Sequence, residues 1–325
     1  MKSKMNLKSI NGYTLKRRST SAVISIFRLG LMIGLAYIFL FPVIYMLTVS
    51  FQTPESAGDP SVMWIPTSLS LDNFKVTMEV LDYWKSFSLS AKISVFSTIA
   101  NVVSCSLVGY GLARFKFREK GIVFAMVILT IIVPSQATMI SSYLNFRFFD
   151  FGGIMNLLSP ITGKDSISLL ETSWVFILPS IFANGIRSGF YIFIFRQFFA
   201  GLPVELEEAA KIDGCGIFKT FIRIMVPNAV PCFVTIILFC FIWHWNEYYG
   251  SVMYFASGVR PINAMLESLV ELLRNSNLYI GNTSTQQIRM YLASGSLLAV
   301  WPPLILYVFL QRYFREGIAK TGIVG

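Results

Sequence analysis

The chain has 325 residues, of which 54% are hydrophobic and only 14% are charged, and its formal net charge is +10. Soluble domains usually carry about 25% charged residues, so this composition argues against a water-soluble protein. The cations lie between apolar runs rather than on one folded face, which argues against a nucleic-acid-binding protein and is typical of positively charged cytoplasmic loops between membrane helices.

Six apolar segments are long enough to cross a bilayer, which takes about 20 residues at a rise of 1.5 Å each. The sequence predicts membrane helices at 29–50, 91–113, 121–143, 173–195, 228–248 and 290–311. The first is longer than the apolar core of a signal peptide, so we expect it to stay in the protein as a helix. The expected fold is one all-α polytopic membrane domain, 29–311, between a basic N-terminal region, 1–28, and a C-terminal tail, 312–325.

The distribution of basic residues predicts the orientation of these helices. With the N-terminus in the cytoplasm, 18 of the 27 Lys and Arg residues lie on the cytoplasmic side, which predicts that both termini are cytoplasmic. The connections at 51–90, 144–172 and 249–289 are then external. Prolines inside the segments remove hydrogen bonds and predict kinks, either fixed or able to tilt during transport, at Pro42, Pro134, Pro179, Pro231 and Pro302-Pro303.

The cytoplasmic connection 196–227 contains a full set of helix signals. Pro203 suits the first position of a helix, acidic residues follow it, and Gly214 suits the left-handed position that ends one. These signals predict a helix of about 11 residues. A second short helix is predicted after Gly214, because apolar residues from Ile217 to Met225 recur at helical spacing. Together they predict a stiff cytoplasmic projection that transmits movement from a partner.

The segment Glu208-Ala209-Ala210-Lys211-Ile212-Asp213-Gly214 resembles the E-A-A loop of the permease subunits of binding-protein-dependent ABC importers. The maltose-type and glycerol-phosphate-type sugar permeases are the most similar. Weaker likenesses occur in Tyr110-Gly-Leu-Ala-Arg-Phe-Lys-Phe117, Trp243-His-Trp-Asn-Glu247 and Arg312-Tyr-Phe-Arg-Glu-Gly317. The resemblance covers nearly the whole chain and implies a type I ABC importer permease fold with six membrane helices.

The resemblance also implies the partners and the cargo. The loop helix is expected to couple the permease to an ATP-binding subunit through Glu208, Ala209, Ala210, Asp213 and Gly214. A second, different permease, two ATP-binding subunits and an extracytoplasmic solute-binding protein are the expected partners in a bacterial cell membrane. The expected substrate is a carbohydrate, while glycerol phosphate, a peptide or another small polar solute remains an alternative.

Candidate substrate contacts lie at the end of the fifth segment, where Trp243, Trp245 and Asn246 combine aromatic faces with a polar group. His244, the single histidine of the chain, is more typical of a packed side chain than of a ligand. The four cysteines do not have metal-ligand spacing, so no metal site is expected.

Catalysis by this chain is not expected. The sequence has no G-x-x-x-x-G-K-[S/T] loop for ATP phosphates, so ATP and Mg²⁺ are expected on a separate ATPase subunit and no cofactor is expected here. A membrane-embedded enzyme would need a cluster of histidines, cysteines or carboxylates. An ion-driven transporter usually has carboxylates near the bilayer centre, and the predicted spans have none before Glu247 at an edge, so that class remains only a remote alternative.

Overall fold

The computed structural model describes residues 7–57, 68–155, 163, 165–276 and 284–321. The first six residues of the predicted N-terminal region and the last four of the predicted tail lie outside the described residues. Helices account for most of the described chain, in agreement with the predicted all-α class. The chain divides into two compact units, Met1–Lys75 with Thr283–Leu297 and Val76–Asn282 with Leu298–Gly325.

The first unit is dominated by one long helix, α1 (Leu7–Ser50), which begins well before the predicted residue 29. Its apolar part, Val23–Ser50, is long enough to span a membrane. Most of the side chains there are exposed, as expected of a surface that lies against lipid or another chain. The short helix α2 (Pro54–Ala57) follows.

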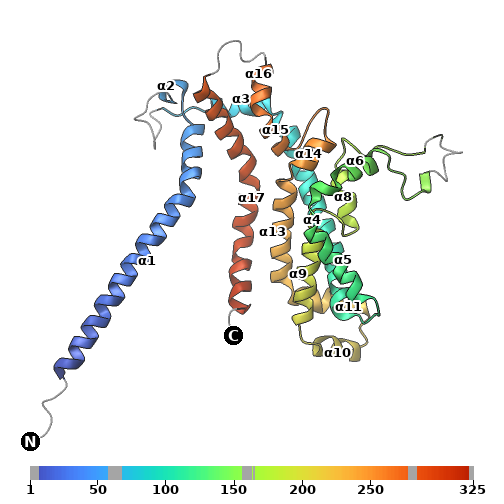
Figure 1. The fold of residues 1–325 in the computed structure, drawn as a ribbon, viewed down its shortest axis with the longest axis horizontal. Helices are drawn as coiled ribbons and strands as arrows, with labels where there is room; N and C mark the ends of the chain where they lie inside the picture. Colours follow the sequence, from blue (N-terminus) through green and yellow to red (C-terminus); the bar gives the residue numbers. More distant parts are fainter. Residues whose placement is uncertain (1–6, 58–67, 156–162, 164, 277–283, 322–325) are drawn as a thin grey trace, which may run out of the picture. The chain divides into compact units, whose positions relative to one another are not determined.

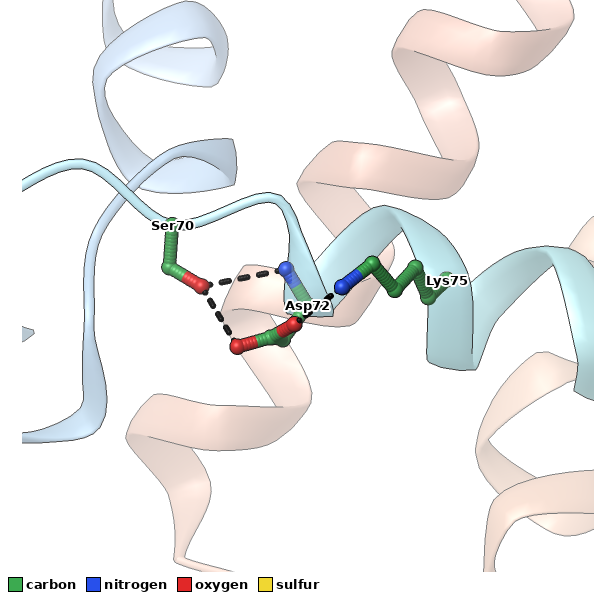
Figure 2. Close-up of polar contacts among 3 residues, drawn as sticks. All are labelled: Ser70, Asp72 and Lys75. Carbon is green, nitrogen blue, oxygen red and sulfur yellow. Dashed lines mark hydrogen bonds and ion pairs between the residues drawn. The ribbon is translucent and has the colours of Figure 1, made fainter.

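Two polar arrangements fix the chain after α1. The side-chain amide of Asn73 donates to the carbonyls of Ser50 and Gln52, at 2.9 and 2.8 Å, and so satisfies backbone groups at the end of the helix. Helix α3 (Asp72–Val80) begins where the Ser70 hydroxyl accepts from the Asp72 N–H and donates to its carboxylate, both at 3.0 Å (Figure 2). Lys75 pairs with the same carboxylate at 2.9 Å and holds the pKa of Asp72 below its ordinary value.

The second unit is built around α4 (Tyr83–Arg114), which packs against α8 (Trp174–Ile181), α9 (Ser188–Gly201) and α13 (Val230–Trp245) (Figure 1). Small residues let helices approach closely where lipid removes the hydrophobic drive for association. The buried face of α4 is rich in such residues, among them Ser86, Ser90, Ser94, Ser97, Thr98, Cys105 and Gly109.

The predicted segment 121–143 is interrupted. Helix α5 (Lys120–Ile132) ends just before Pro134, and the chain continues through η1 (Ser135–Thr138) into α6 (Met139–Arg147) after a bend of 97°. Proline has no N–H and disfavours helical backbone in the residue before it, so it ends the helix here instead of kinking it.

The predicted segment 173–195 is also interrupted. Helices α8 and α9 are separated by a non-helical stretch in which Ala183 and Arg187 have positive φ angles of 54° and 58°. A side chain on Gly185 would meet the amide nitrogen of Asn101 at 2.7 Å. The stretch therefore lies close against α4.

The remaining predicted segments are recognisable with shifted ends. Helix α13 is joined to the preceding Ile217–Asn228 segment by a bend of 82°, and α17 (Thr285–Thr321) continues beyond the predicted 290–311 into the tail. Short helices α14 (Tyr249–Tyr254), α15 (Ile262–Glu267) and α16 (Leu269–Asn275) connect them. Among the described residues, three helices are long and apolar enough to cross a membrane, or up to five if each bent pair is one span. The count of six remains a prediction.

Candidate functional site

The predicted projection contains α10 (Glu205–Ile212), a helix of 8 residues that is shorter than expected. Its first backbone hydrogen bonds run from Glu207 and Glu208 to the Val204 carbonyl, at 3.0 and 3.1 Å. Pro203 therefore lies before the N-cap rather than at the first helical position. The acidic first turn still places negative charge at the positive end of the helix dipole.

The end of α10 confirms the role predicted for Gly214, whose φ of 75° lies in the left-handed region. The Gly214 N–H donates to the Lys211 carbonyl at 3.0 Å, and the Cys215 N–H donates to the Ala210 carbonyl at 2.8 Å. This pair of bonds is a Schellman motif, which satisfies carbonyls that the helix end would otherwise leave free. The turn fixes the direction in which the chain leaves α10.

Four of the five predicted coupling residues, namely Glu208, Ala209, Asp213 and Gly214, are exposed on α10 and its C-terminal turn. Ala210 differs, because it is only 2% exposed and packs inside this chain. Of the two alanines predicted to take part in coupling, only Ala209 is therefore exposed to a partner. Figure 1 shows α10 lying crosswise beyond the end of α9.

The residue that attaches α10 to α4 is not among the predicted coupling residues. Glu207 is buried, and its Oε1 lies 3.1 Å from Nε of Arg114, the last residue of α4. Arg114 also donates from Nη2 to the Leu202 carbonyl at 2.7 Å. A cation at the end of an apolar segment and an acidic loop were both visible in the sequence, but their pairing depends on how distant segments fold together.

The second half of the projection is helical as predicted, in the form of α11 (Ile217–Thr220), a π-helical turn η2 (Phe221–Met225) and α12 (Val226–Asn228). Phe221 and Met225 are buried, whereas Ile217, Phe218 and Ile222 are between 59% and 70% exposed. The exposed apolar side chains suit a lipid or protein surface next to α10.

The predicted substrate residues at the end of α13 have different surroundings. Trp243 is 40% exposed and lies under the guanidinium of Arg187, which is 4.4 Å from the ring centroid. Trp245 is 2% exposed, and its indole N–H already donates to the Ala299 carbonyl at 2.9 Å. Asn246 is exposed, and His244 is buried with Nδ1 2.8 Å from the Cys240 carbonyl oxygen. Trp245 therefore packs α13 against α17, and Trp243 and Asn246 keep accessible surface.

The opposite end of α4 from Arg114 contains an open groove of about 640 Å³. Its lining includes an exposed aromatic ring, two cations, a carboxylate and hydroxyl groups, from Trp84, Lys85, Ser88, Lys92, Glu171 and Ser257. An aromatic face with a few polar groups is a common lining for small-molecule sites.

Comparison with known proteins shows the family to which this chain belongs. Residues 106–320, more than half of the chain, match the family described as binding-protein-dependent transport system inner membrane component. The permease protein YtcP of a polygalacturonan/rhamnogalacturonan transport system in Bacillus subtilis is 26% identical, over 91% of this chain and 96% of that protein. AraQ, an arabinooligosaccharides transport system permease of Halalkalibacterium halodurans, is 28% identical, over 95% of this chain and 100% of its own length.

A solved structure shows the same fold. A bacterial ABC transporter involved in the import of the acidic polysaccharide alginate has a chain that matches 91% of this one and 98% of its own length, with a TM-score of 0.68 and 19% identity. This likeness confirms the predicted ABC importer permease fold. The family match and the apolar helices place the protein in a membrane, and the chain belongs to the family of inner membrane components of binding-protein-dependent transport systems.

Proposed function

We propose that this chain is a permease subunit of an ATP-driven importer of a carbohydrate, and that α10 is the part of it that an ATP-binding subunit moves. The observation that carries the proposal is the exposed surface of α10 in a chain of this transport family. Glu208 offers a carboxylate to a partner cation, and Ala209 leaves room for close approach. The Schellman turn at Gly214 makes this surface stiff enough to transmit a displacement.

ATP hydrolysis takes place on a separate subunit in this proposal, because the chain has no phosphate-binding loop. ATP and Mg²⁺ bind there, two such subunits close, and α10 follows them. A second permease completes the translocation pathway, and a solute-binding protein delivers the cargo from the outside. Both chain termini then lie in the cytoplasm, as the distribution of basic residues predicts.

The proposed cargo is a sugar or oligosaccharide. Support comes from the names of the two permeases described above, whose transport systems are named for polygalacturonan/rhamnogalacturonan and for arabinooligosaccharides. Trp243 and Asn246 keep exposed surface, and the amide of Asn246 can bond a sugar hydroxyl, while Arg187 covers one face of the indole. Glycerol phosphate or a peptide is the alternative cargo, and Arg187 beside Trp243 is a cation that an anionic cargo would meet there.

Co-purification tests the role of α10. The tagged chain is purified from the membranes of cells that also express its neighbouring genes. Three versions are compared: the wild type, Glu208→Arg and Gly214→Ile. The matched control is Glu271→Arg, the same change of charge on exposed α16, which is predicted to be external. The readout is the amount of ATP-binding subunit retained at equal recovery of the second permease.

We expect the two α10 variants to lose the ATP-binding subunit and the control to retain it. A wild-type chain that retains no ATP-binding subunit, or a Glu208→Arg variant that retains it fully, would contradict the proposal. Uptake of labelled oligosaccharides, glycerol 3-phosphate and peptides by the reconstituted importer then tests the cargo. Uptake of a non-carbohydrate alone would overturn the substrate class and leave the importer class intact.

A further inference from the structure

The contact between Arg114 and Glu207 joins two elements that are distant in sequence. Arg114 ends α4, the helix around which the second unit is built, and Glu207 lies in the first turn of α10. The Nε to Oε1 distance is 3.1 Å, and the two side chains are only 9% and 10% exposed. The same guanidinium reaches the Leu202 carbonyl, just before α10, at 2.7 Å.

Burial makes this ion pair different from an ordinary surface pair. The Asp72–Lys75 and Asp82–Lys85 pairs link residues three apart and are at least 45% exposed, so water screens them and they contribute little. A buried charge that loses its partner is strongly unfavourable, because no water replaces the lost interaction. Arg114 and Glu207 are therefore held together whenever the surrounding residues stay packed.

Aromatic side chains pack around the last turns of α4, next to the Arg114–Glu207 contact. The ring of Tyr110 lies 5.7 Å from that of Phe199 and 5.1 Å from that of Phe221, between ring centroids. Phe199 precedes α10 and Phe221 follows it, so both ends of the projection pack on α4. Apolar packing resists separation of the elements, while the attraction between the two buried charges keeps the first turn of α10 against the end of α4.

We propose that the Arg114–Glu207 ion pair is the positioning contact that transmits movement of α10 to the membrane helices. A displacement of α10 reaches α4 through this pair, and α4 contacts α8, α9 and α13. The two residues act through α4 and do not touch substrate or nucleotide. The inference rests on the proposed coupling role of α10 and adds the residues that connect it to the pathway.

The test measures coupling separately from assembly. The complete importer is reconstituted with Glu207→Gln, which keeps the shape of the side chain and removes its charge. Three quantities are recorded: retention of the ATP-binding subunit, ATP hydrolysis, and solute taken up per ATP hydrolysed. The matched control is Asp82→Asn, the same chemical change in the exposed pair near the other end of α4.

We expect Glu207→Gln to retain the ATP-binding subunit and to hydrolyse ATP, while uptake per ATP falls about tenfold, which is within the usual range of coupling between sites. The control should transport normally. The exchange Arg114→Glu with Glu207→Arg restores opposite charges across the contact and should recover most of the uptake. A role confined to stability would lower the amount of importer and leave uptake per ATP unchanged.

Two results would overturn the inference. One is a Glu207→Gln importer with normal uptake per ATP. The other applies if Glu207→Gln fails to assemble. In that case Arg114→Lys is used, because it keeps the charge but loses the forked geometry of the guanidinium. Normal uptake per ATP with Arg114→Lys would then exclude a positioning role. If the wild-type chain retains no ATP-binding subunit, the proposed function fails first, so the two failures are distinguishable.

Discussion

The two ends of α4 are held by opposite kinds of chemistry. At its first residue, the Tyr83 hydroxyl donates to the Leu298 carbonyl at 3.1 Å and accepts from the Trp301 indole at 2.8 Å, so the contacts are neutral and aromatic. At its last residue, Arg114 forms a buried ion pair with α10. The first end is held by neutral hydrogen bonds to α17, whereas the last end is held by a buried pair of charges and by the Leu202 carbonyl. The end that receives the proposed movement is the one with the stricter chemistry.

The largest expected effect comes from breaking the charged end. Glu207→Ala leaves the Arg114 guanidinium buried without its carboxylate, and we expect a loss of stability of about 3 kcal/mol. Glu205→Ala, an exposed change in the same turn, is the control and should have little effect. Thermal unfolding of the purified protein in detergent measures both. Equal midpoints for the two variants would show that the buried pair contributes no more than an exposed carboxylate of the same turn.

The close approach of α4 to α9 gives the second effect. A Cβ on Gly109 would lie 2.5 Å from the Cβ of Phe195, so Gly109→Ala should destabilise the pair of helices by about 2 kcal/mol through overpacking. Gly111, two residues along α4, has its nearest neighbour at 3.7 Å, and Gly111→Ala should be tolerated. The same unfolding assay compares them, and a stable Gly109→Ala protein would show that the helices can separate without loss.

Removing one hydroxyl tests the neutral end. Tyr83→Phe leaves the Leu298 carbonyl and the Trp301 N–H without this partner, and we expect a loss of about 1 kcal/mol. Tyr249→Phe, at an exposed ring, is the control. Uptake per ATP should stay normal in both variants. A fall in uptake per ATP with Tyr83→Phe would mean that the neutral end also takes part in coupling.

The smallest effect is expected at the exposed pair of α3. Lys75 lowers the pKa of Asp72, so the ionised carboxylate favours the folded state. This contribution is complete above the ordinary pKa of the carboxyl, 3.8, and is lost as the pH falls through the lowered value. Asp72→Asn should remove a small acid-dependent part of the stability between pH 5 and pH 2, roughly the range in which carboxyls titrate. A large change at neutral pH would contradict the surface character of this pair.

Part of this account could be predicted from the sequence. The acidic start of α10 and its end at Gly214 are local signals, and the structure confirms the left-handed turn. The all-α membrane fold follows from the apolar segments and from the resemblance of the loop. In both cases the information lies within a short stretch of chain.

The rest depends on contacts between distant segments. Pro134 is compatible with either a kink or the end of a helix, because neighbouring helices can satisfy the freed backbone groups. The break before α9 does have a local signal, the turn dipeptide Asn184-Gly185, which the prediction of one helix over 173–195 did not use. The left-handed residues, Ala183 and Arg187, lie on either side of it and are not residue types that predict such backbone. Ala210 and Glu207 have the same residue types as their exposed neighbours, and only the packing of α10 shows which of them face inward.

The central claim is that the exposed face of α10 meets an ATP-binding subunit, and cross-linking tests it most directly. In a Cys215→Ser background, Ala209→Cys and Ala210→Cys place a thiol at adjacent positions, one exposed and one buried. A short cross-linker with a maleimide at one end and an amine-reactive ester at the other is added to the assembled importer, so that the introduced thiol is joined to a lysine of the ATP-binding subunit. We predict a cross-link to the ATP-binding subunit from position 209 and much less from position 210. Equal cross-linking from both positions, or none from position 209, would contradict the account.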